Sequence, residues 1–171
     1  MSRIPLKDIP TEIAQQIHNL GGKPLNIYKA LANNPHLLKA WLDFAYQLRN
    51  GQTSRALREI MILRTAQLAD SDYEMTQHLK MAQKAGVPQV QIDQLAKWQH
   101  SEAFNQIEKA ALTLTEAVFN NQVTDQIYQN LAKHFDDADM IELLLTASFY
   151  CMVPRFIQAI DVDTQGEEGA L

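Results

Sequence analysis

The chain has 171 residues, of which 46% are hydrophobic and 20% charged, and its net charge is −5. This length suits one domain with a sizeable core, and the composition argues against disorder. The lysines and arginines are scattered, so we expect no nucleic-acid partner. A single cysteine, Cys151, excludes an internal disulfide framework and a multi-cysteine zinc site.

The ends of the chain and its apolar stretches indicate where the protein works. Residues 1–10 contain no apolar core of a secretory signal. The longest apolar stretch, Ile141 to Val153, is broken by Thr146 and Ser148 and stops at Pro154. That stretch is too short to span a bilayer and predicts a buried helix. We therefore expect a cytoplasmic protein with no membrane partner.

Helical periodicity dominates the chain, and convincing alternating strands are absent. The first residues are interrupted by prolines and a Gly-Gly pair and predict one short helix near Glu12 to Leu20. Longer helices are predicted at about 35–48, 54–69, 71–85, 90–98, 106–120, 125–135 and 138–160. The fold class is therefore all-α, a bundle of about six to eight helices. We divide the chain into an N-terminal extension (1–34), a helical domain (35–160) and a flexible tail (161–171).

The helix predicted over 71–85 separates into a polar face and an apolar face. Glu74 and His78 lie on the apolar face, one turn apart, where an i, i+4 pair can touch. The residues expected to face water are Asp72, Thr76, Gln77, Lys80, Gln83 and Lys84. A carboxylate and an imidazole on a buried face need polar partners, since burying them alone is costly.

The helix predicted over 54–69 is apolar almost all round, which is typical of the middle of a bundle. Glu59 falls among its apolar residues and should therefore be buried. Two carboxyl groups and one histidine would then point into the same apolar interior. Burial raises the pKa of a carboxyl group and a nearby cation lowers it, and acid–base catalysis uses such mixtures. Glu59, Glu74 and His78 are therefore the candidate catalytic residues.

Each of these residues also has a structural interpretation. Ser71-x-x-Glu74 fits a capping box, in which Glu74 only satisfies the start of its helix. Glu59 can form an ion pair with Arg55, one turn earlier. A single inward histidine is often a hydrogen-bonded core residue.

Other kinds of site find little support. The remaining histidines are dispersed, with no pair at a metal-ligand spacing, so we expect no metal. The sequence has no Gly-rich phosphate loop and no G-x-S-x-G elbow, and we expect no cofactor. Cys151 lies in an apolar helix and is expected to be a buried, unreactive thiol.

Four stretches of the sequence form a recognisable set of motifs. They are Arg58-Glu-Ile-Met-Ile-Leu-Arg-Thr-Ala-Gln-Leu-Ala, Tyr73-Glu-Met-Thr-Gln-His, Ala82-Gln-Lys-Ala-Gly-Val-Pro and Phe149-Tyr-Cys-Met-Val-Pro. The first three resemble the central motif of the carboxymuconolactone decarboxylase and alkylhydroperoxidase D (AhpD) family, and the last is similar to that family's second signature. The resemblance covers roughly Pro35 to Ile160 and implies an AhpD-like helical bundle.

The peroxidase branch of the family has a glutamate, eleven residues, C-x-x-C, three residues and a histidine. That spacing falls on Glu59, Ser71, Glu74 and His78, so the glutamate and histidine are kept and both cysteines are replaced. A dithiol peroxidase needs a nucleophilic thiolate and a resolving thiol. Peroxidase or peroxiredoxin activity, which the family would imply, is therefore disfavoured.

The decarboxylase branch resembles this chain in its Glu-x-x-x-His, here Glu74 to His78. The resemblance implies a cofactor-free lyase acting on a small carboxylated lactone or related organic acid. His78 would transfer the proton, Glu74 would orient it or relay protons, and Glu59 would be a second buried carboxyl. The substrate-binding candidates are Tyr73, Ser71 and Cys151, with Arg64 and Arg155 as possible partners of a substrate carboxylate.

The resemblance also implies a homo-oligomer, a trimer or hexamer, with pockets near the subunit contacts. Two other functions stay open beside the lyase. One is a non-catalytic oligomeric binding protein that kept the scaffold without the chemistry. The other is an antioxidant protein that uses Cys151 with external thiols. Whether the chain is an enzyme is not decided by the sequence, and a decarboxylase-like lyase is favoured over a thiol peroxidase.

Overall fold

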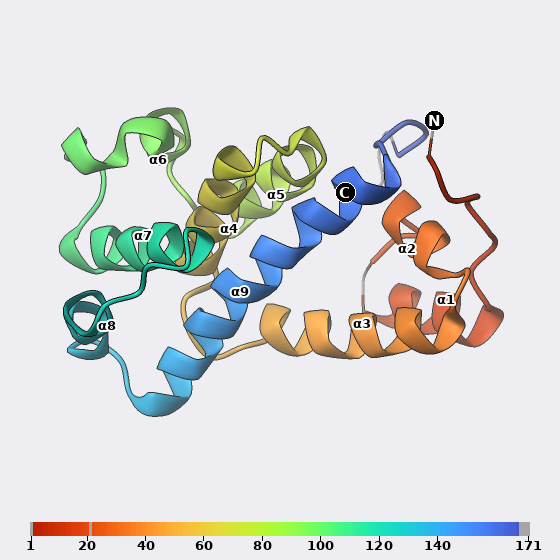
Figure 1. Ribbon diagram of the computed structural model, residues 1–171, viewed down its shortest axis with the longest axis horizontal. Helices are drawn as coiled ribbons and strands as arrows, with labels where there is room; N and C mark the ends of the chain where they lie inside the picture. Colours follow the sequence, from red (N-terminus) through yellow and green to blue (C-terminus); the bar gives the residue numbers. More distant parts are fainter. Residues whose placement is uncertain (1, 21, 168–171) are drawn as a thin grey trace. The chain divides into compact units, whose positions relative to one another are not determined.

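The computed structural model describes residues 2–20 and 22–167. Over those ranges it contains nine α-helices, one 3₁₀ helix and no strand (Figure 1), which confirms the all-α prediction. The helices are α1 (Thr11–Asn19), α2 (Asn26–Leu31), α3 (Pro35–Arg49), α4 (Arg55–Leu68), α5 (Asp72–Lys84), α6 (Gln89–Gln94), η1 (Leu95–His100), α7 (Gln106–Phe119), α8 (Asp125–Ala132) and α9 (Asp137–Ile160). Every helix predicted after residue 34 is present.

Side-chain caps fix where several of these helices begin. Asn34, Ser54, Ser71, Asn105 and Thr124 each accept a hydrogen bond from the backbone N–H three residues further on. Such a bond satisfies one of the donors that the first helical turn leaves unpaired. At α7 the cap is reciprocal, because Glu108 also accepts the backbone N–H of Asn105. These short polar residues are the start signals that the sequence shows.

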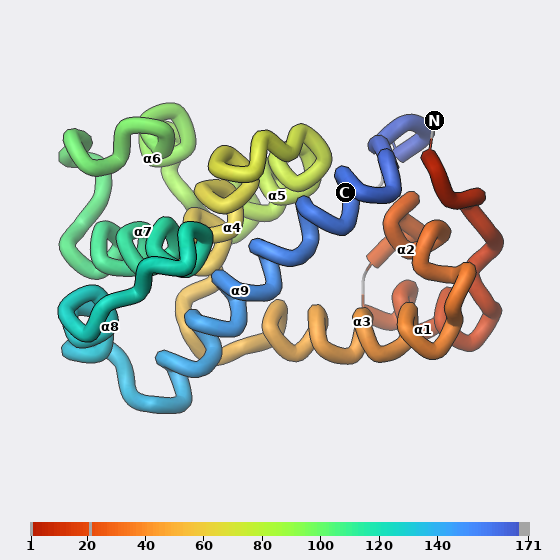
Figure 2. Tube along the Cα trace, in the orientation of Figure 1, coloured from red at the N-terminus to blue at the C-terminus, as the bar shows by residue number. Residues whose placement is uncertain are grey.

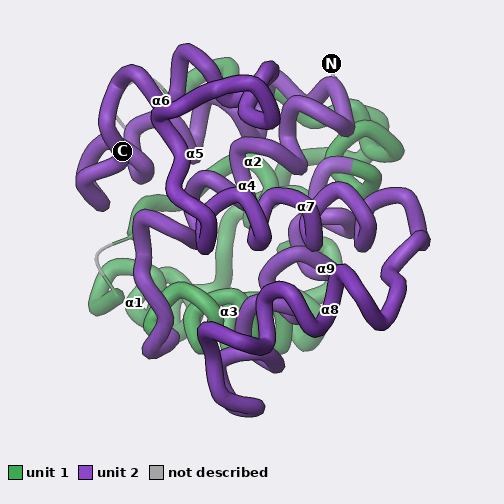
Figure 3. The backbone as a smooth tube through the Cα atoms, turned by 90° about the vertical axis from the view of Figure 1, so that its left-hand side faces the viewer, with its two compact units in different colours: residues 1–50, 155–171 green, residues 51–154 purple. Residues whose placement is uncertain are grey.

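The chain forms two compact units, residues 1–50 with 155–171 and residues 51–154 (Figure 3). In the first unit, Ile13 and Ile17 of α1 are buried with Leu38, Leu42 and Tyr46 of α3. The N-terminal segment of this unit caps the end of α9, because the Arg3 N–H and the Ser2 hydroxyl both donate to the Ile160 carbonyl. The division at residues 34 and 160 stays a prediction.

The second unit is built around α4, which contacts α5, α7 and η1 (Figures 1 and 2). Helix α8 packs on α7. The largest fully buried residues of this core are Ile60, Met61, Leu63, Leu95, Leu112, Leu114, Leu131, Met140 and Leu143. Helix α4 is apolar almost all round because other helices surround it on most sides, as its sequence predicted.

The loop before α4 is tied to α9 by Glu142. Its carboxylate accepts the N–H groups of Gln52 and Thr53 and the Thr53 hydroxyl, and it forms an ion pair with Arg58. The Arg58 side chain is only 3% exposed. A Cβ atom on Gly51 would overlap this carboxyl group, which explains why a glycine stands there.

Replacing Glu142 with alanine should therefore destabilise the protein by about 3 kcal/mol, because Arg58 would stay buried without its carboxylate. Chemical denaturation gives the free energy of unfolding. Glu102→Ala, which removes an exposed acidic side chain from the same unit, is the matched control and should change stability by less than about 0.5 kcal/mol. Equal effects of the two substitutions would mean that the Glu142 network contributes nothing special.

Helix α9 extends the apolar stretch noted in the sequence to 24 residues. By length and composition alone it is sufficient to cross a membrane. The buried core helix of a globular protein passes the same test. Met140, Leu143 and Ala147 of this helix are buried in the core of the second unit.

Candidate functional site

The turn between α4 and α5 brings the candidate residues together. Helix α4 ends at Leu68, and the turn after it contains Asp70, whose φ of 51° lies in the left-handed region that aspartate tolerates better than most residues. The Ser71 N–H donates back to the Ala66 carbonyl, and the Ser71 hydroxyl then caps α5 by accepting the Glu74 N–H. This tight reversal lays α5 alongside α4, so that Glu59 and His78 face each other.

Glu59 lies between a histidine and an arginine. Its Oε2 is 2.8 Å from His78 Nδ1, and its Oε1 forms an ion pair with the Arg55 guanidinium. The Glu59 side chain is 0% exposed and that of His78 is 8% exposed. The predicted burial of Glu59 and its i, i+4 pair with Arg55 are confirmed. Since each carboxylate oxygen has a different partner, Glu59 fixes the orientation of the imidazole ring.

Glu74 lies on the other side of the imidazole. Its Oε2 is 3.6 Å from His78 Nε2, which is longer than a hydrogen bond. Among the described residues this buried oxygen has no hydrogen-bond partner. The Ser71 N–H, which a capping box would direct to Glu74, donates instead to Ala66. Only the Ser71 half of the predicted box is therefore present, and the Glu74 carboxyl is not used to cap its helix.

An aromatic ring from α9 completes the surroundings of the histidine. The rings of Tyr150 and His78 meet at 88° with centroids 4.9 Å apart. This edge-to-face arrangement is a favourable one for aromatic rings. Tyr150 itself is half-buried. Three helices, α4, α5 and α9, thus each place one side chain against His78.

The two carboxyl groups are driven in opposite directions by their surroundings. Burial alone would raise the pKa of Glu59, but the charge and hydrogen bond of His78, together with Arg55, hold that pKa below its usual value. For Glu74 burial dominates, and the negative charge of Glu59 adds to it, so the pKa is raised. Burial opposes a charged His78, yet Glu59 and then Glu74 outweigh it and raise the imidazole pKa. The surroundings therefore favour the ionised form of Glu59 and the protonated form of Glu74, on either side of one imidazole.

The other residues predicted for the site lie in different surroundings. Tyr73 is buried in α5, Ser71 is the N-cap of that helix, and Cys151 is half-buried next to Tyr150 in α9. Arg64 forms an ion pair with Glu116 of α7. Arg155 is exposed and belongs to the other unit.

Two details of the sequence-based site need correction. Gln77, predicted to face water, is only 4% exposed, because α5 is buried over a wider arc than its pattern of apolar residues indicates. Tyr150, which contacts His78, was not among the predicted site residues. It belongs to the second family signature, beside Cys151, and that position was the only signal for it.

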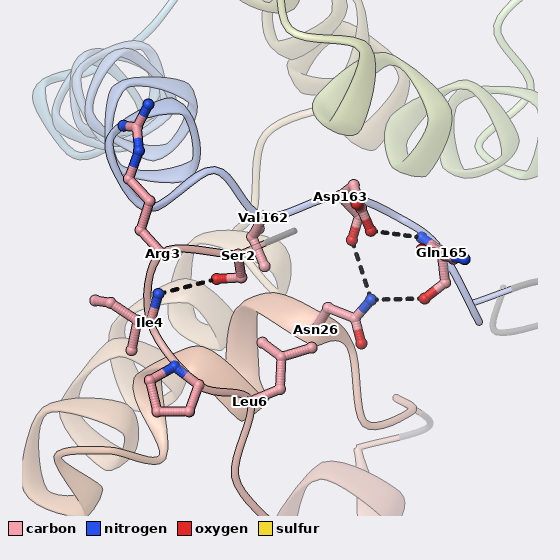
Figure 4. Close-up of a pocket in the computed structure, with 9 residues that line it drawn as sticks. Ser2, Arg3, Ile4, Leu6, Asn26, Val162, Asp163 and Gln165 are labelled. Atoms are coloured by element: carbon pink, nitrogen blue, oxygen red, sulfur yellow. Dashed lines mark hydrogen bonds between the residues drawn. The ribbon is translucent and has the colours of Figure 1, made fainter.

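A separate hollow of about 510 Å³ lies in the first unit (Figure 4). It is lined by the N-terminal segment, Asn26 and the segment after α9. The Asn26 amide donates to the carbonyls of Asp163 and Gln165, and the Asp163 carboxylate accepts the Gln165 N–H. These polar groups are hydrogen-bonded to one another. The packing of the N-terminal segment and the segment after α9 therefore explains the hollow.

Candidate metal ligands do not converge anywhere in residues 2–20 and 22–167. No group of three or more histidine, cysteine, aspartate or glutamate side chains there is placed to hold a metal ion. The side chains around His78 are of the kinds that can transfer protons and stabilise charge.

Comparison with known proteins supports the resemblance to a known family. The model of the carboxymuconolactone decarboxylase family matches residues 35–117, a span that includes Glu59, Glu74 and His78. Over these residues the chain is similar to that family. A relative in Bacillus subtilis (strain 168), the uncharacterized protein YdfG, is 25% identical over 114 residues, which are 65% of this chain and 78% of YdfG.

Solved structures show that the fold is AhpD-like. An uncharacterized peroxidase-related protein from Ralstonia eutropha JMP134, described as an alkylhydroperoxidase AhpD core, superposes with a TM-score of 0.81. Its sequence is 21% identical, and the match covers 97% of this chain and 93% of that one. The debrominase Bmp8, solved as a cysteine-to-alanine variant in complex with 2,3,4-tribromopyrrole, superposes with a TM-score of 0.78 at 17% identity, over 97% and 95% of the two chains.

Proposed function

We propose that this protein is a cofactor-free lyase that removes carbon dioxide from a small carboxylated lactone or a related organic acid. The observation that supports the proposal is the arrangement of two carboxyl groups with oppositely shifted pKa values on either side of His78. Environments that drive paired titratable groups apart are typical of acid–base sites. As further proposals, the protein is cytoplasmic and forms a homo-oligomer.

In the proposed reaction, the bond between the substrate's carboxylate carbon and the adjacent ring carbon breaks. Carbon dioxide leaves, and the electron pair stays on the ring carbon as an enolate conjugated with a carbonyl group. A charged His78 stabilises the developing negative charge, and its Nε2 proton is then transferred to the carbon. Glu59 keeps the ring oriented through Nδ1, and Glu74 returns a proton to Nε2. The carboxylic proton of the next substrate or the solvent reloads Glu74, so that charge and protons balance.

The sequence left two roles open for Glu74, orienting the histidine or relaying protons. The contacts favour the second, because His78 Nδ1 is hydrogen-bonded to the Glu59 carboxylate. Glu74 is better suited to proton relay, because burial favours its protonated form.

The buried Glu74 carboxyl also favours an enzyme over a non-catalytic binding protein. A buried polar atom without a hydrogen bond costs about 1–3 kcal/mol, and its retention calls for an explanation beyond packing. Glu59 alone would not decide the matter, since its pairing with Arg55 has a structural value of its own. A dithiol peroxidase is not proposed, because the chain has one cysteine.

The proposal is tested by incubating the purified protein with a panel of small carboxylated lactones and related acids in D₂O. We expect enzyme-dependent release of carbon dioxide, with one deuterium from solvent on the carbon that lost its carboxylate. Parallel reactions with alkyl hydroperoxides and an external thiol test the antioxidant alternative through Cys151. Peroxide consumption without carbon dioxide release would reject the lyase in favour of that alternative.

Replacing Glu74 with glutamine should reduce kcat by about 10²-fold, at the lower end of the range for general acid–base groups, because His78 can still deliver one proton but is reprotonated slowly. Glutamine is close in shape to the protonated carboxyl, so the fold should be kept. Steady-state kinetics on the best substrate of the panel measures the effect, with the exposed Glu102→Gln as control. An unchanged kcat would remove Glu74 from the proton relay.

A further inference from the structure

Three charged or titratable groups form a series of contacts at the site, from Arg55 to Glu59 and from Glu59 to His78. The Glu59 carboxylate divides its two oxygens between them, with Oε1 on Arg55 and Oε2 on His78 Nδ1. Arg55 and Glu59 lie one turn apart on α4, so the helix itself sets their spacing. The Arg55 side chain is 27% exposed, whereas that of Glu59 is 0% exposed. Arg55 is therefore at the solvent-facing end of this series of contacts.

We propose that Arg55 is a positioning residue of this site, which acts through Glu59 to hold His78 in orientation and to oppose its protonation. The role of His78 in proton transfer, and with it the catalytic meaning of this inference, rests on the proposed lyase function. The electrostatic coupling itself does not, because it follows from the three side chains alone.

The coupling follows from what happens when His78 loses its proton. The Glu59 carboxylate then stays buried in its ionised form, and an isolated buried anion is costly. The positively charged guanidinium of Arg55 compensates that charge through its ion pair with Glu59. Its positive charge also repels a protonated imidazole directly, and it lowers the His78 pKa that burial and the two glutamates would otherwise set. Arg55 thus makes it easier for His78 to give up its proton.

The groups that face His78 come from three helices. Glu59 and Arg55 belong to α4, Glu74 belongs to α5, and Tyr150 on α9 contributes a ring. The glutamates favour the charged imidazole, and Arg55 is the group that opposes it by charge. Since Glu59 and His78 interact strongly, the measurable quantity is the apparent pKa of the coupled pair.

The test is an NMR titration of the His78 ring, observed through its nitrogen chemical shifts in ¹⁵N-labelled full-length protein. The His78 signal is the one that disappears in His78→Gln. We expect the apparent pKa to rise in Arg55→Gln and to lie closer to the wild-type value in Arg55→Lys, which keeps the charge. Arg55→Met, which keeps the apolar stem, is a second charge-free variant and gives the same comparison if Arg55→Gln does not fold.

Arg64→Gln is the matched control. It removes an arginine and an ion pair from the same helix, but the pair is with Glu116 and does not involve His78. The His78 pKa should be the same in this variant as in the wild type. An unchanged pKa in both charge-free Arg55 variants, or an equal shift in Arg64→Gln, would overturn the inference.

The titration needs no substrate, so the two proposals are judged separately. If the His78 pKa rises in Arg55→Gln but the protein releases no carbon dioxide, the coupling is kept and the lyase is rejected. If the protein releases carbon dioxide but the His78 pKa is the same in the Arg55 variants as in the wild type, the lyase is kept and the coupling is rejected. In an active enzyme, the limb of the pH–rate profile that reports His78 should move to higher pH in Arg55→Gln.

Discussion

His78→Gln is expected to lower the rate of carbon dioxide release by about 10²–10⁴-fold, the range that a positioned acid–base group contributes. Glutamine has an amide that can still donate to Glu59, but it cannot carry a proton to a carbanion. The effect should appear in kcat and in kcat/KM alike, since the lost interaction belongs to the transition state. Initial rates of carbon dioxide release, measured on the substrate that the screen identifies, give both values.

The fold of this variant should be retained, because Glu59 keeps its ion pair with Arg55. Thermal unfolding followed by circular dichroism checks this point. His134→Gln is the control, since it makes the same substitution at an exposed histidine of the same unit and should leave the rate unchanged. Full activity in a folded His78→Gln protein would exclude His78 from the mechanism.

Much of the fold could be predicted from the sequence because its helices are delimited by local signals. Caps such as Ser54, Ser71 and Thr124 are visible as residue types, and each accepts the expected backbone hydrogen bond. The apolar circumference of α4 placed it correctly in the centre of its unit. Helix α2 was missed, because a six-residue helix between Pro24 and Asn33 is too short for a helical period to show.

The candidate site was predicted less completely, since its pairings cross between helices. Sequence spacing favours contacts within one helix, so it identified Arg55 with Glu59 and Glu74 with His78. The hydrogen bond from His78 goes instead to Glu59, 19 residues away. That choice depends on how the turn at Asp70 and Ser71 aligns α4 with α5, which no residue pattern fixes.

Gln77 and Tyr150 are two further residues whose surroundings the sequence does not predict. Gln77 has the polarity of a surface residue, but α5 is covered over a wide arc and the residue is buried. Tyr150 reaches His78 only because α9 passes beside α5, and the helical periodicity of α9 does not indicate that neighbour. Periodicity thus predicts which face of a helix is buried, but not what lies against it.

At the positions where the peroxidase branch would have cysteines, this chain uses polar groups that cannot do thiol chemistry. Ser71 is an N-cap, and its hydroxyl serves the backbone of α5. Glu74 points its carboxyl toward His78 instead. The glutamate and histidine that remain, Glu59 and His78, still form a hydrogen bond. The scaffold therefore keeps a hydrogen-bonded glutamate–histidine pair and has a second carboxyl group where sulfur chemistry would have needed a thiol.

Glu59→Gln is expected to destabilise the protein by about 3–5 kcal/mol at pH 5–6, the cost of removing one partner from a buried ion pair. Arg55 and His78 would lose the carboxylate that lies between them. Chemical denaturation at a series of pH values measures the free energy of unfolding of both proteins. Glu116→Gln is the control, because it breaks the ion pair of Arg64 on the same helix without touching His78.

The pH dependence distinguishes this cause from general damage to the core. In the wild type the raised pKa of His78 stabilises the folded protein below the ordinary value of 6.5, and this contribution is lost as the pH rises through the folded pKa. The lowered pKa of Glu59 stabilises it above 4.5, and that contribution is lost as the pH falls through the folded pKa. Both contributions are present between pH 4.5 and 6.5.

The difference in unfolding free energy between the wild type and Glu59→Gln should therefore be largest in that window and smaller on either side of it. The Glu116→Gln control should show a difference that does not follow the titration of His78. A Glu59→Gln deficit that stays constant from pH 4 to pH 9 would mean that the glutamate acts by packing alone. A deficit that peaks near pH 5–6 would show that the buried carboxylate works as the counter-charge of a protonated histidine.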